Sequence, residues 1–277
     1  MMVRKPEVMI LGAGPAGLLA AHAADRAGYK FTVYSRPDKH DGKRPEKSRL
    51  YGCQYLHKLP PGISPDVRQQ RVRYLLDGSP AAYRRKVYGD AWDGKVSPDE
   101  YGPEEDHTAY DLRYVYDVLW NRYSSAIVPT VVGPDMADVL FKTTKTIIFS
   151  SIPAPDLCRR PEHHKFLTQD VYASGSSPTS TPPITVPDGT VVCNGSPHTA
   201  WYRAATVFGH TTVEWPGGRR PPFDGVVPVR KPLATDCNCR DGASRRSNRW
   251  HRIGRYGTWT KSVLVHTAYA KAVTVLR

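Results

Sequence analysis

The residues with the clearest chemical meaning lie in the run Gly12-Ala13-Gly14-Pro15-Ala16-Gly17 near the start of the chain. In the pattern Gly-x-Gly-x-x-Gly, the first glycine permits a tight turn and the second lets a pyrophosphate approach the backbone. The third allows a helix to pack closely on a strand. The N–H groups at the start of that helix attract phosphate. The spacing therefore predicts a dinucleotide-binding turn, whose contact residues are Gly12, Ala13, Gly14, Pro15, Ala16 and Gly17.

The elements around this run have the types that such a turn needs. Residues 8–11 form a short apolar run that predicts a strand, and the alanine-rich residues 16–27 predict a helix that stops at Gly28. Residues 31–34 then read as a second strand. Together they predict a compact β-α-β unit with a right-handed crossover.

The run from Ile10 to Leu18 resembles the opening of FAD-dependent oxidoreductases of the glutathione-reductase-like superfamily, which implies FAD as the cofactor. These proteins usually place an acidic residue at the end of the second strand, where it holds the ribose hydroxyls. This chain has Ser35 and Arg36 there instead. A serine followed by an arginine suits the 2′-phosphate of NADP, so NADP is the alternative cofactor. Ser35 and Arg36 are therefore predicted cofactor-binding residues.

A second segment, residues 252–259, is similar to the C-terminal Gly-Arg-aromatic segment of the UDP-galactopyranose mutase and amine-oxidase branch of that superfamily. The resemblance implies that Gly254, Arg255 and Tyr256 lie at the cofactor, with the arginine on its pyrophosphate. A basic loop before a surface helix is the alternative interpretation of the same residues.

Two more stretches supply candidate residues for the flavin ring or the substrate. In residues 51–57, Gly52 would allow close backbone approach, and Gln54 or His57 would hydrogen-bond the ring or the substrate; a structural turn is the alternative. Residues 201–203 resemble the substrate-domain pattern of the mutases, which makes Trp201 and Arg203 candidates. Core aromatic residues would explain that stretch as well.

The pair Cys237-Asn238-Cys239 would suit redox chemistry or half of a metal site, because thiolates are both nucleophiles and soft ligands. No second cysteine pair or histidine pair lies at ligand spacing, and His163 and His164 are adjacent. The sequence therefore predicts no metal site. The five cysteines are spread widely, which indicates reduced thiols rather than a disulfide framework.

Further elements follow from periodicity. Apolar spacing predicts helices over residues 66–76, 110–123, 135–142 and 263–276. Short apolar runs predict strands over residues 146–150, 190–193, 205–208 and 211–214, the first of them in the same sheet as residues 8–11. The Ser, Thr and Pro content of residues 173–187 predicts a surface loop.

These patterns predict an α/β fold with a Rossmann-like domain built on a parallel sheet, and an inserted, smaller α+β substrate region. The resemblance implies that the Rossmann-like domain binds FAD. The FAD-binding domain would comprise residues 1–42, 135–153 and 250–277. The inserted region would comprise residues 43–134 and 154–249.

The formal net charge of +13 predicts attraction to anions, either an anionic small-molecule substrate or nucleic acid. No long apolar run predicts a membrane span, and the N-terminus lacks the layout of a signal peptide, so a cytoplasmic protein is expected. The first functional hypothesis is a flavin-dependent oxidoreductase acting on a small or nucleotide-like substrate. The alternatives are an NADP-binding protein, a non-redox flavin mutase, and a basic nucleotide- or nucleic-acid-binding protein without turnover.

Overall fold

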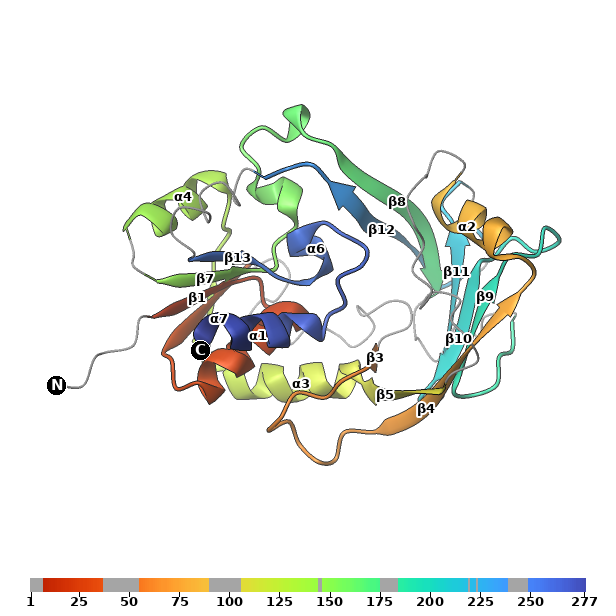
Figure 1. Ribbon diagram of the computed structural model, residues 1–277, viewed down its shortest axis with the longest axis horizontal. Helices are drawn as coiled ribbons and strands as arrows, with labels where there is room; N and C mark the ends of the chain where they lie inside the picture. Colours follow the sequence, from red (N-terminus) through yellow and green to blue (C-terminus); the bar gives the residue numbers. More distant parts are fainter. Residues whose placement is uncertain are drawn as a thin grey trace.

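The computed structural model describes residues 7–36, 55–89, 106–143, 146–174, 184–218, 220–222, 224–238 and 249–277. These residues form a parallel sheet with helices on both faces and, beside it, a large curled sheet of mostly antiparallel strands (Figure 1). The predicted α/β class with a parallel sheet is thereby confirmed.

The parallel sheet has β1 at its centre and runs in the order β13-β7-β1-β2-β6. Its strands are β13 (Trp250–Arg252), β7 (Ile147–Ser150), β1 (Val8–Leu11), β2 (Phe31–Ser35) and β6 (Ile127–Pro129). All four residues of β1 are buried, because both faces of the sheet are covered. Burying each such apolar side chain contributes about 1.5–3 kcal/mol. The sheet draws on segments from both ends of the chain and from its middle.

Alternate residues of β1 face opposite layers of helices. Val8 and Ile10 pack in one core cluster with α1 (Pro15–Arg26), α3 (Leu112–Tyr123) and α7 (Thr267–Leu276). Met9 and Leu11 belong to a second cluster that includes Ala137 of α4 (Pro134–Thr143). Helices α1, α3 and α7 therefore cover one face of the sheet and α4 the other, as Figure 1 shows.

The curled sheet is built from two four-stranded sections. One has the order β10-β11-β8-β12 and the other β3-β5-β4-β9. Their strands are β10 (Arg203–Val207), β11 (His210–Pro216), β8 (Phe166–Ser174), β12 (Val226–Thr235), β3 (Tyr55–Leu56), β5 (Asp106–Asp111), β4 (Gln69–Asp77) and β9 (Thr190–Asn194). The sections join where β9 lies beside β10, with backbone hydrogen bonds from Gly189 to Thr206 (2.8 Å) and from Asn194 to Tyr202 (2.7 Å).

Short helices complete the described part of the chain. They are α2 (Pro80–Tyr88), η4 (Ser124–Ala126), η5 (Ala154–Leu157), η6 (Pro161–His163) and α6 (Gly254–Thr258). Among the described helices, none combines the length and the apolar character that a membrane span requires.

Most predicted elements are present. The helices predicted over 110–123 and 135–142 are α3 and α4, and the strand predicted over 146–150 is β7, parallel to β1. The strands predicted over 190–193, 205–208 and 211–214 are β9, β10 and β11, although Phe208 lies in the turn after β10 with a φ of +55°. The C-terminal helix begins only at Thr267.

The helix predicted over 66–76 is wrong. Residues 69–76 belong instead to strand β4, which pairs antiparallel with β5 and parallel with β9. Within the strand, Val72, Tyr74 and Leu76 are less exposed than the residues between them, and that alternation is the period of a strand. Strands β8 and β12 and helix α2 were not predicted. Strand β6 comes from residues 43–134, the range predicted to belong to the inserted region.

Candidate functional site

Three strands of the parallel sheet end side by side and bring distant segments of the chain together. The backbone N–H of Ser151, after β7, donates to Leu11 at the end of β1 (2.8 Å). The N–H of Ile253, after β13, donates to Ser150 (2.8 Å). Because the strands are parallel, the glycine-rich turn after β1 and the loop after β13 lie at the same edge of the sheet. Ligands of open α/β sheets bind at this carboxyl edge.

The glycines of the predicted dinucleotide turn differ in what surrounds them. Gly12 has a φ of +100°, a conformation that favours glycine. A Cβ on Gly17 would collide with the carbonyl oxygen of Gly12, so Gly17 lets α1 approach β1. A Cβ on Gly14, by contrast, would meet no protein atom within 4 Å. Gly14 therefore faces open space, where an added side chain would clash with a bound ligand and not with the core.

Gly14 is also the N-cap of α1, and no side chain caps this helix end. The first N–H groups of a helix have no partners within the helix, and the helix dipole places partial positive charge there. The turn itself is held by the hydroxyl of Tyr116, which donates to the carbonyl of the buried Ala13 (2.9 Å). The start of α1 thus presents uncapped N–H donors beside open space.

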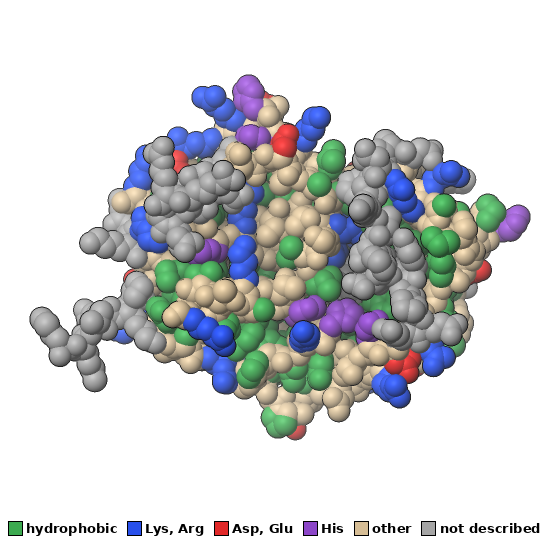
Figure 2. All heavy atoms as spheres, in the orientation of Figure 1, with side chains coloured by type: hydrophobic (Ala, Val, Ile, Leu, Met, Phe, Trp, Pro, Cys, Tyr) green, Lys and Arg blue, Asp and Glu red, His purple; other side chains and the backbone are tan. Residues whose placement is uncertain are grey.

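A pocket of about 460 Å³ opens at this point. This volume is within the range of about 300–1,000 Å³ that is usual for small-molecule and cofactor sites. Figure 2 shows histidine side chains gathered near the centre of the molecular face and basic side chains around them. The pocket is lined by Gly14, Pro15, Ala16, Tyr55, His57, Tyr74, Leu112, Ser151, Arg203, Glu214, Val229, Lys231, Ile253, Gly254, Arg255, Tyr256, Val263, Leu264, Val265 and His266.

The segment after β13 supplies a second part of the lining. Gly254 has a φ of +67°, and a Cβ there would lie 2.6 Å from the Cβ of Ala16. Glycine at this position lets α6 begin directly against the start of α1. Arg255 and Tyr256 follow in the pocket wall, and the Tyr256 hydroxyl donates to the carbonyl of Arg230 (3.0 Å). The structure thus places Gly254, Arg255 and Tyr256 beside the glycine-rich turn.

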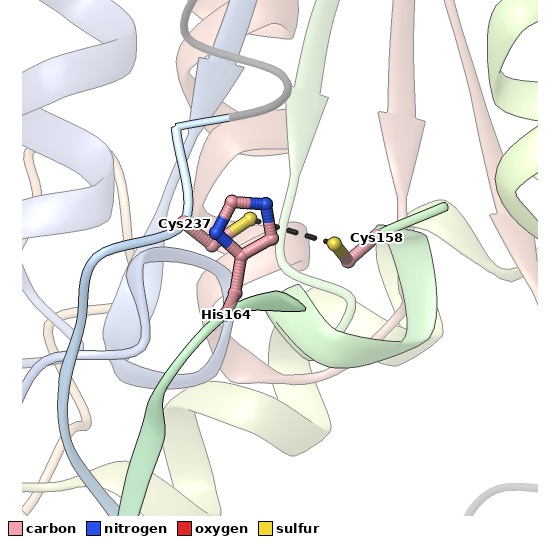
Figure 3. A group of neighbouring side chains, drawn as sticks. All are labelled: Cys158, His164 and Cys237. Atoms are coloured by element: carbon pink, nitrogen blue, oxygen red, sulfur yellow. Dashed lines mark hydrogen bonds between the residues drawn. The ribbon is translucent and has the colours of Figure 1, made fainter. Parts of the chain in front are cut away.

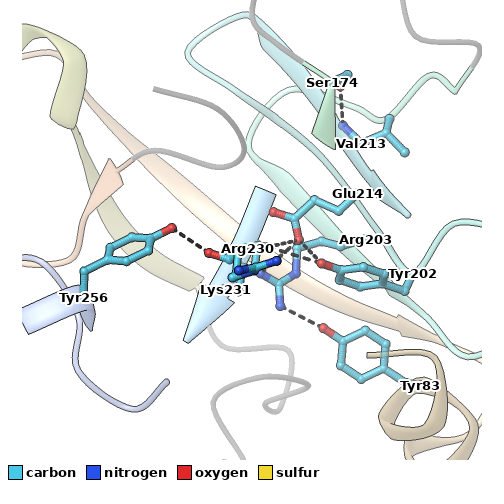
Figure 4. Close-up of polar contacts among 9 residues, drawn as sticks. All are labelled: Tyr83, Ser174, Tyr202, Arg203, Val213, Glu214, Arg230, Lys231 and Tyr256. Atoms are coloured by element: carbon cyan, nitrogen blue, oxygen red, sulfur yellow. Dashed lines mark hydrogen bonds and ion pairs between the residues drawn. The ribbon is translucent and has the colours of Figure 1, made fainter. Parts of the chain in front are cut away.

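The opposite wall of the pocket carries the charged side chains of Arg203, Glu214 and Lys231, from β10, β11 and β12, and phenolic side chains lie behind them (Figure 4). The Glu214 carboxylate, 5% exposed, pairs with the Lys231 ammonium at 2.6 Å and lies 3.8 Å from the Arg203 guanidinium. It also accepts a hydrogen bond from the Tyr202 hydroxyl (2.7 Å). Arg203 in turn donates to the Tyr83 hydroxyl (2.9 Å).

Burial and the cations act in opposite directions on this cluster. Burial alone would raise the pKa of Glu214, but Lys231 and Arg203 together lower it to about 2. Burial lowers the pKa of Lys231, against the opposing attraction of Glu214. Glu214 is therefore a carboxylate at any physiological pH. Two cations face one carboxylate, so the wall keeps an excess of positive charge toward the pocket.

Two histidines, His57 and His266, also line the pocket. The ring of His57 lies 5.7 Å from that of His107 and 5.8 Å from that of His266, centroid to centroid. Burial lowers the pKa of His266, and nearby Lys58 adds to this effect. His266 is therefore neutral near pH 7 and able to donate or accept a hydrogen bond.

The remaining predicted site residues divide into three groups. His57 and Arg203 line the pocket, whereas Trp201 packs in the core cluster of β10 and β11 instead. Ser35 is buried at the end of β2 and Arg36 is exposed, and neither belongs to the pocket lining. Gly52 and Gln54 lie outside the described residues.

Sequence reasoning missed Glu214, Lys231, Tyr116 and His266. For Glu214 a signal was present, because it is the single carboxylate of β11 and stands between Val213 and Trp215, which are apolar and buried. Lys231 and His266 gave no comparable signal, since the pocket wall is assembled from segments far apart in the sequence.

No protein-family model matches the sequence, and no curated protein matches it. Among solved structures, a reduced UDP-galactopyranose mutase matches with a TM-score of 0.63 and 12% identity, over 99% of this chain and 93% of that one. A geranylgeranyl bacteriochlorophyll reductase-like protein from Thermoplasma acidophilum matches with a TM-score of 0.51 and 12% identity, over 98% and 77% of the two chains. CmlS, a flavin-dependent halogenase, gives 0.51 and 13%, over 100% and 58%.

The chain shares the fold of these proteins. This agrees, at the level of fold, with the superfamily that the glycine-rich run resembles. At identities of 12–13% the likeness extends no further than the fold.

Proposed function

We propose that this chain is an FAD-dependent enzyme, an oxidoreductase that acts on a small anionic or nucleotide-like substrate. The observation that carries the proposal is the open space at Gly14, which lies at the uncapped start of α1 and in the wall of the pocket. A pyrophosphate fits such a position, because N–H groups and the helix dipole attract it and no Cβ blocks it. Support comes from the fold, which the flavin-dependent halogenase and the mutase share.

Different residues of this chain would hold different parts of the cofactor. The start of α1 and Arg255 would hold the pyrophosphate, with the arginine reaching it from the far end of the sequence. Ser35 and Arg36, at the end of β2, would lie near the adenosine ribose. FAD supplies the electron and hydride transfer, while the protein orients it and tunes its electronics.

The wall formed by β10, β11 and β12 would bind the substrate. Arg203 and Lys231 are held in place by Glu214, and they outnumber its single negative charge. Fixed cations of this kind select an anionic group such as a carboxylate or a phosphate. His57 and His266 also line the pocket, where they would hydrogen-bond the substrate or the ring.

A second candidate is a non-redox flavin mutase acting on a nucleotide sugar. It is favoured by the match to the reduced UDP-galactopyranose mutase, which covers 93% of that chain. The two candidates differ in one measurable way. An oxidoreductase consumes an electron donor in proportion to product, whereas a mutase needs only one initial reduction and then turns over without further donor.

The cofactor proposal is tested by the absorbance spectrum of the purified protein and by its melting temperature with and without added FAD. Bound flavin should give two visible bands, and FAD should raise the melting temperature because it binds the folded state. Gly14→Val should abolish both effects while the circular dichroism spectrum stays native, since the valine meets the ligand and not the core.

Gly133→Val is a matched control for that variant. Gly133 also precedes a proline at the start of a helix, α4, and a Cβ there would likewise meet no atom within 4 Å. Gly133 does not line the pocket, so its variant should retain FAD. A colourless protein whose melting temperature does not change when FAD is added would overturn the proposal.

A further inference from the structure

Outside the pocket, the fold brings together Cys158, His164 and Cys237 (Figure 3). Cys158 follows η5 and His164 follows η6, both in the connection between β7 and β8. Cys237 lies just beyond the end of β12. The donor atoms of the three side chains all lie within 4.8 Å of one another, the one such group among the described residues.

The two sulfur atoms are separated by a distance that a metal ion would require. The Sγ of Cys237 donates a hydrogen bond to the Sγ of Cys158 at 3.7 Å, the contact drawn in Figure 3. Two thiolates on one tetrahedral zinc ion are roughly 3.8 Å apart, since each Zn–S bond is about 2.3 Å long. A disulfide needs about 2.05 Å and would have to draw the two chain segments closer. The backbone thus already holds the thiols at the spacing of zinc ligands.

The surroundings of His164 match those of a metal-bound histidine. Its Nδ1 lies 3.5 Å from Oδ1 of Asp236, and the same carboxylate oxygen accepts a hydrogen bond from the N–H of Lys165 (2.8 Å). Histidines that bind metals usually donate their other ring N–H to a carboxylate, which fixes the ring and its tautomer. With Nδ1 near Asp236, Nε2 would be the ring nitrogen that binds the metal.

Charge and burial favour a dication at this position. Cys158 and Cys237 are both 4% exposed, and two buried thiolates would balance the charge of one zinc ion. The Arg252 guanidinium donates to Sγ of Cys237 (3.8 Å) and to its carbonyl oxygen (3.3 Å). Such N–H donors stabilise a thiolate. Two sulfurs and an imidazole nitrogen are a donor set that binds zinc in preference to magnesium or calcium.

We propose that Cys158, His164 and Cys237 bind a zinc ion that fastens the end of β12 to the connection between β7 and β8. Water completes the tetrahedron. The ion would hold the outer ends of the long antiparallel pair β8 and β12 where the chain passes from the parallel sheet to the curled one (Figure 1). Metal binding of this kind contributes directly to folding free energy. The site shares no residue with the pocket, so it stands or falls independently of the flavin proposal.

The first test is the metal content of the full chain, purified without chelators and measured by mass spectrometry. The protein should carry zinc equimolar with the chain, and Cys158→Ser, Cys237→Ser and His164→Ala should each lose it. His163→Ala is the matched control, because this neighbouring side chain is 66% exposed and outside the cluster. It should keep the zinc.

A second measurement keeps the test decisive if a variant fails to fold. Zinc is removed from the unmodified protein with a chelator, and alkylation of its thiols is followed before and after zinc is restored. Added zinc should protect two thiols, identified by peptide mapping as Cys158 and Cys237, and should raise the melting temperature. Cobalt in place of zinc should give d–d bands to the red of the flavin absorption.

Two outcomes would overturn the proposal. One is a folded protein that takes up no zinc after incubation with equimolar metal, or that contains a Cys158–Cys237 disulfide instead. The other is zinc that is lost as readily from His163→Ala as from His164→Ala, which would show surface binding. Loss of zinc with retention of flavin would confirm that the two sites are separate.

Discussion

The two walls of the pocket are built in opposite ways. The wall at the parallel sheet is made of backbone, and its key residues are glycines. Gly14 leaves space for a ligand, and Gly17 lets α1 pack tightly against the turn after β1. The wall at the curled sheet is made of side chains, and its key residues are the cations Arg203 and Lys231, which pair with the carboxylate of Glu214. One wall would recognise the same phosphate group in any dinucleotide, whereas the other would decide which substrate enters.

This difference explains why the first wall can be recognised in the sequence and the second cannot. Gly12, Gly14 and Gly17 act through the local conformation of one turn, so their spacing alone carries the information. Glu214 and Lys231 belong to different strands that do not pair with each other, since β8 lies between β11 and β12. Only the folded sheet brings them together.

The largest effect should come from placing a side-chain atom between α1 and the turn after β1. Gly17→Ala adds a single Cβ, which would collide with the Gly12 carbonyl oxygen. The oxygen is part of the backbone and the Cβ is bonded directly to the backbone of α1, so neither atom can move alone. We expect a loss of about 4 kcal/mol in the free energy of unfolding, measured by urea denaturation. Alanine is the better helix former, so propensity cannot account for such a loss.

Gly14→Ala is the matched control for that variant. It makes the same chemical change within the same turn, but the added Cβ would meet no protein atom. Its unfolding free energy should stay within about 1 kcal/mol of the parent, as is usual for changes that disturb no core contact. Equal losses in the two variants would mean that the two glycines do not have the separate roles assigned to them.

The next largest effect should come from the charged wall. Glu214→Gln leaves Lys231 and Arg203 without their carboxylate, while both retain about one-fifth of their side-chain exposure (20% and 22%). Removing one partner of a fully buried pair costs about 3–5 kcal/mol, and partial exposure reduces this to about 2–3 kcal/mol here. Asp170→Asn breaks the exposed pair between Asp170 and Arg230, 65% and 69% exposed, and should cost at most about 1 kcal/mol.

The same carboxylate should make stability depend on pH. The pKa of Glu214 is lowered from 4.5 to about 2 in the folded state. The unfolded chain therefore binds the proton first, and the stabilisation is present above about pH 4.5 and is lost as the pH falls toward 2. Glu214→Gln should remove this part of the acid sensitivity. An unchanged acid unfolding profile in the variant would show that the carboxylate is not held by the two cations.

The elements that the sequence predicted well are those whose patterns are local. Residues 8–11 are uniformly apolar, as a strand buried on both faces must be, and α1 is rich in alanine up to Arg26. The failure at residues 66–76 has a physical cause as well. Strand β4 is exposed on alternate residues and gains its stability from β5 and β9, which are distant in the sequence. Cys158 and Cys237 likewise meet only through the fold.

Arg255 links the two ends of the chain at the glycine-built wall. If it pairs with the pyrophosphate, the charge-assisted hydrogen bonds contribute about 1.5–3 kcal/mol. Arg255→Ala should then weaken FAD binding roughly ten- to a hundredfold, as measured by fluorescence titration of the protein freed of cofactor. Arg71→Ala removes the same charge from β4, where the side chain is 82% exposed, and should leave FAD affinity unchanged. Similar losses in both variants would indicate a general effect of positive charge.

The smallest effect on FAD binding should come from Arg36, and it separates the two cofactors that the sequence allows. Arg36 is exposed, directly after β2, at the position where the proteins that the glycine-rich run resembles usually have an acidic residue. FAD offers no phosphate to this position, whereas NADP offers its 2′-phosphate. Arg36→Ala should therefore leave FAD affinity within about a factor of two, less than a weak hydrogen bond would change it.

Titrating the parent and Arg36→Ala proteins with FAD, NADP and NAD in parallel gives distinct results for the two cofactors. The FAD proposal requires tight FAD binding in both proteins and no preference of the parent for NADP over NAD. A parent that prefers NADP, and loses that preference when Arg36 is removed, would assign the glycine-built wall to a nicotinamide dinucleotide. The charged wall would then face a nicotinamide ring, and Glu214 and Lys231 would keep their structural role unchanged, because their pairing does not depend on which dinucleotide is bound.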